Sequence, residues 1–274
     1  MNKIMDGKKV RDLKLEKLKN IVNKLDKQLT LCVISVEENP ASKVYIKQKE
    51  KFAKLVGYDF LNLHFDKIKE EDLINKIIEL NEDNNITGII VQLPLPDYLN
   101  KNKIVNAISY KKDVDGLTNY NLIKLIKKED GLIPCTPKGI LTLLEYYKIN
   151  LIQNIVIVGR SDLVGLPLFH LLLNKNATVT LCHSKTNNLA SITKNADILI
   201  SAVGKKGLIT KEMIKQDVII IDVGINRVDD KLYGDVENDC IDLASLITPV
   251  PGGVGPMTVL SLMENVYNAY LMQK

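Results

Sequence analysis

The 274-residue sequence contains no tryptophan, and its aromatic residues make up only 5% of the chain. Grooves that bind single-stranded nucleic acids combine basic residues with stacked aromatic rings, so this scarcity argues against a nucleic-acid partner. Lysine and arginine number 37 and aspartate and glutamate 33, which leaves a net charge of +4. The two signs are mixed along the chain, as on solvated surfaces, although a modest positive charge would help an anionic substrate to approach.

Metal-ligating side chains are also scarce. There are three histidines, and the four cysteines (Cys32, Cys135, Cys182 and Cys240) are far apart and lack the spacing of a zinc site. We therefore expect no metal, and we expect Cys32 and Cys182 to be reduced residues of apolar strands. No apolar run approaches the roughly 18 residues of a membrane-spanning helix, and the N-terminal stretch does not resemble a secretory signal. These absences predict a cytoplasmic protein without a membrane partner.

The length of the chain favours two domains. Apolar residues at helical spacing alternate with short β-branched runs, which predicts an α/β fold with parallel strands and crossover helices. The expected strands are residues 29–36, 58–65, 88–91, 155–158, 178–182, 198–202 and 218–223. The expected helices include residues 8–25, 41–56, 70–81, 100–108 and 257–272, with one more from 134 through 147. Residues 226–235 predict a hairpin with Asp229 and Asp230 at its turn.

The stretch 154–167 predicts a nucleotide site, because a β-branched run ends at Gly159 and an apolar helix follows. This strand, turn and helix is the first unit of a dinucleotide-binding fold. In the register of the usual G-x-G-x-x-G pattern the three positions are Gly159, Ser161 and Val164, and Gly165 comes one place late. A tight strand-to-helix turn without a ligand is the alternative interpretation.

The residues after the next expected strand indicate which nucleotide would bind. An NAD site usually has an aspartate or glutamate about 20 residues beyond the glycines, where it binds the ribose hydroxyl. This chain instead has His183, Ser184, Lys185 and Thr186 there, with Arg160 beside the first turn. Donors and cations in place of a carboxylate suit a 2′-phosphate, so the pattern favours NADP.

Polar residues in the first half of the chain suggest proton chemistry. Tyr45 and Lys49 lie four residues apart in an expected helix and so share a face; such a pair can relay a proton when burial adjusts the lysine pKa. Gln92 follows an expected strand, where open parallel sheets bind ligands. Asp113 and Asp115 lie two apart in a loop, where a carboxylate could bind an amino-pyrimidine donor pair. Each feature also has an ordinary structural interpretation, as helix packing, strand ending or turn.

Considered together and in order, these motifs identify a family. The segments are 42–49 (Ser-Lys-Val-Tyr-Ile-Lys-Gln-Lys), 91–96 (Val-Gln-Leu-Pro-Leu-Pro), 112–116, 134–137, 159–161, 182–186, 222–226 and the proline- and glycine-rich 249–256. Over essentially the whole chain they closely resemble the bifunctional methylenetetrahydrofolate dehydrogenase/methenyltetrahydrofolate cyclohydrolase family. The family shares the irregular dinucleotide turn, so the late glycine does not argue against membership.

The resemblance implies an N-terminal α/β catalytic domain with a parallel sheet, formed by residues 1–138 and 256–274, and a Rossmann-type NADP-binding domain of residues 139–255. Reduced folate, in polyglutamylated form, would bind in the cleft between them, and the protein would be a homodimer with the 226–235 hairpin as a contact. The implied catalytic residues are Lys49, Tyr45, Gln92 and Asp115. The implied cofactor contacts are Gly159, Arg160, Ser161, Ser184 and Ile225. The implied substrate contacts are Tyr45, Gln92, Leu93, Asp115, Pro251, Gly252 and Gly253.

The resemblance also implies two reactions: oxidation of 5,10-methylenetetrahydrofolate to 5,10-methenyltetrahydrofolate with NADP⁺, and hydrolysis of that product to 10-formyltetrahydrofolate. Both belong to one-carbon metabolism and serve purine, methionine and histidine synthesis. Three alternatives stay open. Another two-domain dehydrogenase would act on a hydroxy or amino acid, but it has no use for Tyr45, Gln92 and Asp115 together. A member that keeps only the dehydrogenase is disfavoured by the intact Tyr45, Lys49 and Gln92. A regulator that senses nucleotides would bind without turnover.

Overall fold

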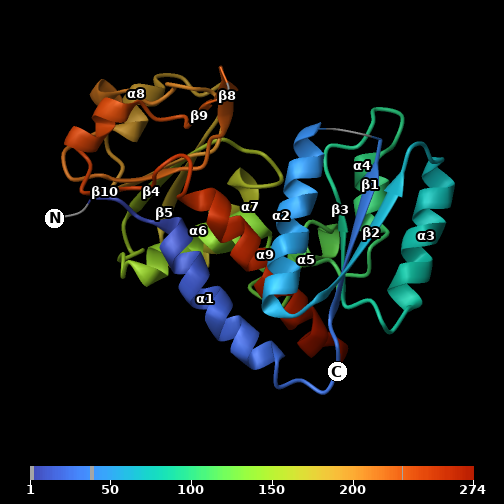
Figure 1. The fold of residues 1–274 in the computed structure, drawn as a ribbon. Coiled ribbons are helices and arrows are strands. Elements are labelled where there is room, and N and C mark those ends of the chain that lie inside the picture. Colours follow the sequence, from blue (N-terminus) through green and yellow to red (C-terminus); the bar gives the residue numbers. More distant parts are fainter. Residues whose placement is uncertain (1–2, 38–39, 230) are drawn as a thin grey trace. The chain divides into compact units, whose positions relative to one another are not determined.

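The computed structural model describes residues 3–37, 40–229 and 231–274, and the chain forms two compact units (Figure 1). Of the described residues, 13–37, 40–135 and 259–274 form one, called here the three-stranded unit, and 3–12, 136–229 and 231–258 form the other, the five-stranded unit. Residues 3–12 group with the five-stranded unit, because the Met5 N–H donates to the Ile247 carbonyl (2.8 Å) and Ile4 bridges Ile247 in parallel.

The three-stranded unit is built on a parallel sheet in the order β2-β1-β3. Its strands are β1 (Thr30–Val36), β2 (Asp59–Phe65) and β3 (Gly88–Val91). Two crossover helices connect them, α2 (Pro40–Val56) and α3 (Glu70–Glu82), as the alternating pattern predicted. The central strand β1 is buried along nearly its whole length, and its side chains join those of α3 in one apolar cluster. Burial on both faces explains why β1 is a continuous apolar run.

Two further helices, and the larger parts of two helices that begin in the five-stranded unit, belong to this unit. They are α1 (Gly7–Val22), α4 (Lys101–Asn106), α5 (Asn119–Ile126) and α9 (Val254–Gln273). The α5 helix was not predicted, since its eight residues are too few to show a clear period. Its start is instead marked by a cap, because the Thr118 side chain accepts the N–H of Asn121.

The five-stranded unit contains a parallel sheet in the order β10-β7-β6-β4-β5. Its strands are β4 (Asn154–Val158), β5 (Thr178–Cys182), β6 (Ile198–Ser201), β7 (Ile219–Asp222) and β10 (Leu246–Ile247). When the strands are numbered along the chain, this order is 2-1-3-4-5, one of the two common doubly wound arrangements. All the strands are parallel, but the direction in which the chain adds strands to the sheet reverses between β4 and β6, which is the switch point. Ligands of such sheets bind outside the carboxyl ends of the strands at that switch point.

The helices of this unit are α6 (Cys135–Tyr146), α7 (Gly165–Leu173) and α8 (Leu189–Thr193), with 3₁₀ turns η1 (Lys211–Met213) and η2 (Asn238–Asp242). The predicted hairpin is confirmed as antiparallel strands β8 (Asn226–Val228) and β9 (Lys231–Tyr233). Asp229 in its turn has a φ of 47°, and the other predicted turn residue, Asp230, lies outside the described residues.

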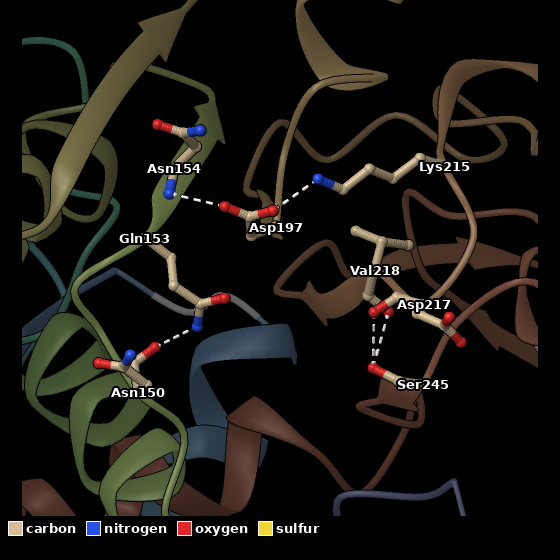
Figure 2. A network of polar contacts seen from close by, with 8 residues as sticks. All are labelled: Asn150, Gln153, Asn154, Asp197, Lys215, Asp217, Val218 and Ser245. Atoms are coloured by element: carbon tan, nitrogen blue, oxygen red, sulfur yellow. Dashed lines mark hydrogen bonds and ion pairs between the residues drawn. The ribbon is translucent and has the colours of Figure 1, made fainter.

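Side-chain hydrogen bonds also connect the amino-terminal ends of strands in the five-stranded sheet (Figure 2). Asp197, just before β6, accepts the backbone N–H of Asn154 at 2.9 Å and the ammonium of Lys215 at 2.5 Å. The hydrogen bond from Lys215 lowers the pKa of Asp197. Nearby, the Ser245 hydroxyl donates to the backbone carbonyl of Asp217 at 2.8 Å. The edge opposite the switch point is therefore stabilised by charge-assisted bonds within the protein.

The turn from β4 into α7 requires glycine at two positions. Gly159 has a φ of 119°, and a Cβ there would overlap the carbonyl oxygen of Ala202, which follows β6. A Cβ on Gly165, the first residue of α7, would overlap the carbonyl oxygen of Gly159. In the regular fingerprint the third glycine allows close packing of helix against strand. Gly165 has that role here, which explains why the pattern tolerates a glycine one place late.

We expect Gly165→Ala to lower the free energy of unfolding by about 1–3 kcal/mol, because the added methyl group meets backbone atoms that cannot move independently. The matched control is Gly255→Ala in α9, where a Cβ would meet nothing within 4 Å; it should be neutral or stabilise by at most about 1 kcal/mol. Thermal denaturation of both variants tests this. Equal midpoints would show that the close contact at Gly165 is not needed.

Candidate functional site

The cluster around Lys49 is the most unusual polar arrangement in the three-stranded unit. Lys49 lies on α2, and its ammonium donates a 2.7 Å hydrogen bond to Oε1 of Gln92. Gln92 directly follows β3, is buried, and donates from Nε2 to its neighbour's carbonyl, Leu93 O, at 2.7 Å. Its backbone N–H donates to Ile34 of β1. The glutamine is thus fixed by the sheet, with its amide oxygen directed at the lysine.

Burial shifts the ionisation of both charged groups in this cluster. Lys49 keeps some exposed surface, yet burial of its side chain lowers its pKa, and the nearby charges of Asp115 and Cys135 oppose that shift only in part. Burial likewise raises the pKa of Asp115, opposed by Lys49. Withdrawal from water favours the neutral form of each group. A lysine that is easily deprotonated, next to a fixed acceptor, can exchange a proton with a substrate.

The structure distinguishes the two loop aspartates, of which the family resemblance implied a functional role for Asp115. Asp113 is almost completely buried, and its carboxylate accepts the backbone N–H groups of Gly116, Leu117 and Thr118 at 2.8–3.1 Å. It also accepts from the Asn121 side chain at 2.9 Å. Asp113 therefore shapes the loop, whereas the Asp115 carboxylate lies near Lys49. The functional assignment to Asp115 is the one the geometry favours.

Two residues of this cluster were not predicted. The Cys135 thiol hydrogen-bonds the Asp115 carboxylate, which lowers the pKa of Asp115, and its backbone N–H donates to the Asp115 carbonyl at 3.3 Å. The side-chain amide of Asn265 on α9 donates to the carbonyls of Val114 and Ile133, both at 2.9 Å. The sequence offered one sign of the role of Asn265, since a polar residue among the apolar positions of the last helix needs hydrogen-bond partners when it is buried. Both residues support the segment that carries Asp115.

Tyr45 and Leu93 lie beside the cluster. Tyr45 is one helical turn before Lys49 on α2 and is 48% exposed, so its ring is accessible to a ligand. The hydrogen bond from the Lys49 ammonium goes to Gln92, not to Tyr45. Leu93 is half-buried and precedes a cis peptide bond to Pro94.

In the five-stranded unit, the carboxyl ends of β4 and β5 bring the predicted nucleotide contacts together. Val158 pairs with Cys182, and Arg160 and Ser184 each follow two residues later. The His183 N–H donates to the Thr186 hydroxyl and the Thr186 N–H to the His183 carbonyl, both at 2.8 Å. This turn exposes Ser184 and Lys185, and Arg160 is also exposed. Donors and cations without a carboxylate fit a phosphorylated ribose.

The remaining predicted contacts also lie in the five-stranded unit. Ser161 shapes the start of α7, because its hydroxyl accepts the Val164 N–H (3.2 Å) and its carbonyl accepts the Leu166 N–H (3.1 Å). Ile225 follows β7 and is 50% exposed.

The loop between β10 and α9 carries Pro251, Gly252 and Gly253. The Gly252 carbonyl accepts the N–H groups of Gly7 and Lys8, at 3.0 and 3.2 Å. The predicted substrate contacts are therefore divided between the two units. The three-stranded unit carries the other four, which are Tyr45, Gln92, Leu93 and Asp115.

Two kinds of site are absent from the part of the chain that the structure describes. The His, Cys, Asp and Glu side chains of residues 3–37, 40–229 and 231–274 form no group of three or more that could hold a metal ion. None of the described helices combines the length and the apolarity needed to cross a lipid bilayer.

Comparison with known proteins gives a consistent result for both halves of the chain. Residues 5–115 match the model of the tetrahydrofolate dehydrogenase/cyclohydrolase catalytic domain, and residues 134–274 match that of the NAD(P)-binding domain of the same family. A relative from Acholeplasma laidlawii, described as "Bifunctional protein FolD", is 45% identical and covers 99% of each chain.

Solved structures of this family also resemble the chain closely. The bifunctional methylenetetrahydrofolate dehydrogenase/cyclohydrolase of Campylobacter jejuni is 41% identical, with a TM-score of 0.96 over 98% of this chain and 99% of the other. The Trypanosoma brucei enzyme, solved with NADP cofactor and an inhibitor, is 32% identical, with a TM-score of 0.93 over 98% and 97%.

We expect Asp115→Asn to lower the pKa of Lys49 further, because the negative charge that stabilises its ammonium form is removed. The measurement is an NMR titration of the lysine side-chain nitrogens. Asp66→Asn is the control, since that carboxylate is 96% exposed and is not among the charges that act on Lys49. An unchanged or higher Lys49 pKa in Asp115→Asn would contradict the electrostatic coupling.

Proposed function

The chain belongs to the tetrahydrofolate dehydrogenase/cyclohydrolase family, and we propose that it carries out both reactions of that family. It oxidises 5,10-methylenetetrahydrofolate to 5,10-methenyltetrahydrofolate with NADP⁺, and it hydrolyses this product to 10-formyltetrahydrofolate. The observation that carries the proposal is the contact between Lys49 and Gln92 beside Asp115, which supplies a proton-transfer group and a pterin acceptor together.

The hydrolytic reaction is the one that needs a proton-transfer group. Water adds to the cationic methenyl carbon and loses one proton, which gives a neutral hydroxyl adduct. The bond from that carbon to N5 then breaks as N5 gains a proton and the hydroxyl group loses one, so that the formyl group stays on N10 and one proton is released overall. Burial increases the neutral fraction of Lys49, and a neutral amine can accept the water proton. The same amine can still donate an N–H to Gln92, which fixes its position. Lys49 is therefore the general base of this proposal, and Gln92 is its positioning partner.

Substrate recognition is assigned to Asp115 and to the groups near it. A pterin has an amino group and a ring N–H side by side, and an aspartate accepts such a donor pair with both oxygens. Asp113 cannot serve, because backbone N–H groups already occupy its carboxylate. The exposed ring of Tyr45 is suited to border the pterin, with Leu93, Pro251, Gly252 and Gly253 as further substrate contacts.

The dehydrogenase reaction uses the five-stranded unit. NADP⁺, when bound, supplies the acceptor for the hydride of the methylene carbon. Gly159 and Gly165 let the β4 turn pack closely against the start of α7, where backbone N–H groups can bind a pyrophosphate, with Ser161 beside it. The exposed Arg160 and Ser184, at the ends of paired strands, suit the 2′-phosphate, and the exposed Ile225 suits an apolar face of the cofactor. These residues bind and orient the cofactor and take no part in proton transfer.

Three finer points also belong to the proposal. The four free, buried cysteines suit the reducing environment of the cytoplasm. The net charge of +4 suits a polyglutamylated, and therefore anionic, folate. A homodimer with the β8–β9 hairpin as a contact would cover the partly exposed apolar side chains of Val228 and Leu232.

We expect Lys49→Met to reduce the cyclohydrolase rate by at least about a hundredfold, which is the usual contribution of a positioned general base. Some dehydrogenase activity should remain, because hydride loss from the methylene carbon is driven by the N5 lone pair. The two rates are measured separately, from hydrolysis of methenyltetrahydrofolate and from reduction of NADP⁺. Lys47→Met, exposed on the same helix, is the control. Two intact rates in Lys49→Met would contradict the role of Lys49.

We expect Asp115→Ala to weaken folate binding by about tenfold or more, since a charge-assisted hydrogen-bonded pair contributes about 1.5–3 kcal/mol. Titration calorimetry with a reduced folate measures this, and the same titration with NADP⁺ should be nearly unaffected. Unchanged folate affinity would mean that the pterin binds elsewhere.

A further inference from the structure

Two buried aspartates interlock at the carboxyl edge of the five-stranded sheet. Asp222 is the last residue of β7 and Asp235 follows β9, and neither has a role in the reactions described above. A Cβ on Gly224 would overlap the Asp235 carboxylate, and a Cβ on Gly234 would overlap the Asp222 carboxylate. Each carboxylate thus occupies the space left by a glycine next to the other aspartate.

Asp235 holds the segment that follows β6. Its carboxylate accepts the backbone N–H groups of Val203, Gly204 and Lys205, at 2.8, 3.3 and 2.8 Å. The Ser201 hydroxyl donates to it at 3.0 Å and the Asn226 amide at 3.3 Å. Successive N–H groups that converge in this way form an anion-binding concavity. Here the anion is the protein's own carboxylate, so these donors are not available to a phosphate.

Asp222 holds the segments on either side of the hairpin. It accepts the N–H of Gly224 at 3.1 Å, that of Asp235 at 2.9 Å and that of Val236 at 3.0 Å. The pKa of Asp222 is raised to about 6, because burial and, to a smaller extent, the charge of Asp235 raise it more than the backbone hydrogen bonds lower it. Holding an anion in this position is unfavourable unless the backbone donors stay in place, which ties the conformation of these segments to the two carboxylates.

The segments held in this way lie at the edge where a cofactor binds. Ser201 pairs with Asp222 in the sheet, so residues 202–205 and 223–226 leave adjacent strands at the same edge. They include Ala202, against which the Gly159 turn packs, and the exposed Ile225. Displacement of either segment would therefore move the surroundings of the nucleotide turn.

We propose that Asp235 and Asp222 are positioning residues for the cofactor, acting through the backbone of residues 202–205 and 223–226 without contacting it. This inference rests on the proposed assignment of NADP to the five-stranded unit. It makes the two carboxylates determinants of cofactor affinity that leave the Lys49 cluster, in the other unit, unaffected.

The test variant is Asp235→Asn, which keeps the shape of the side chain but places an amide NH₂ opposite backbone N–H donors. Titration calorimetry should show NADP⁺ binding weakened by about tenfold or more, with the cyclohydrolase rate, which needs no nucleotide, within about twofold of the original. The matched control is Asp197→Asn, just before β6, at the end of that strand opposite the segment that Asp235 holds; Figure 2 shows the bonds of Asp197. It should leave NADP⁺ affinity within about twofold.

Unchanged NADP⁺ affinity in a folded Asp235→Asn protein would overturn the inference, and so would an equal loss in Asp197→Asn. If Asp235→Asn does not fold, Ser201→Ala is the second variant, because it removes one donor to Asp235 and keeps the carboxylate. A several-fold weaker affinity in Ser201→Ala then supports the inference, and unchanged affinity contradicts it. Failure of the proposed function is a separate result, since the unmodified protein would then bind no NADP⁺ at all.

Discussion

The partial burial of Lys49 beside Asp115 is the constraint on which the proposed chemistry depends. An ammonium and a carboxylate withdrawn from water both lose solvation, and each is pushed toward its neutral form. Their mutual attraction and the bond to Gln92 offset only part of this cost. The result is a lysine whose pKa is lowered, so that it loses its proton more readily than a fully solvated lysine.

The rest of the three-stranded unit keeps this arrangement in place. Gln92 is fixed by its position after β3, and Asp113 closes the loop through backbone N–H groups. Lys112 is buried and donates to the carbonyls of Leu80 and Asp83 at the end of α3, where a cation is favoured. Neighbouring charged residues in one short loop thus have separate tasks, and only Asp115 is directed toward Lys49.

The five-stranded unit uses close backbone contacts and internal carboxylates for the same purpose. Gly159 and Gly165 allow the β4 turn, the segment after β6 and the start of α7 to lie in contact. Asp222 and Asp235 then fix the segments that follow β6 and β7. Because protein groups satisfy these backbone donors, the edge proposed to bind the cofactor is organised without a ligand, and such organisation reduces the entropy lost on binding.

Local patterns in the sequence determined most of the architecture. Strand and helix periodicity predicted the parallel α/β units and the hairpin, and a helical spacing of four identified Tyr45 and Lys49 as neighbours. Other features depended on contacts between distant segments, which spacing along the chain does not encode. The family resemblance indicated Asp115, and the tertiary structure added that Asp113 serves the loop, that Cys135 and Asn265 support that loop, and that residues 3–12 join the five-stranded unit. Which partner a buried polar group finds depends on the path of the backbone around it, and that path exists only in the folded chain.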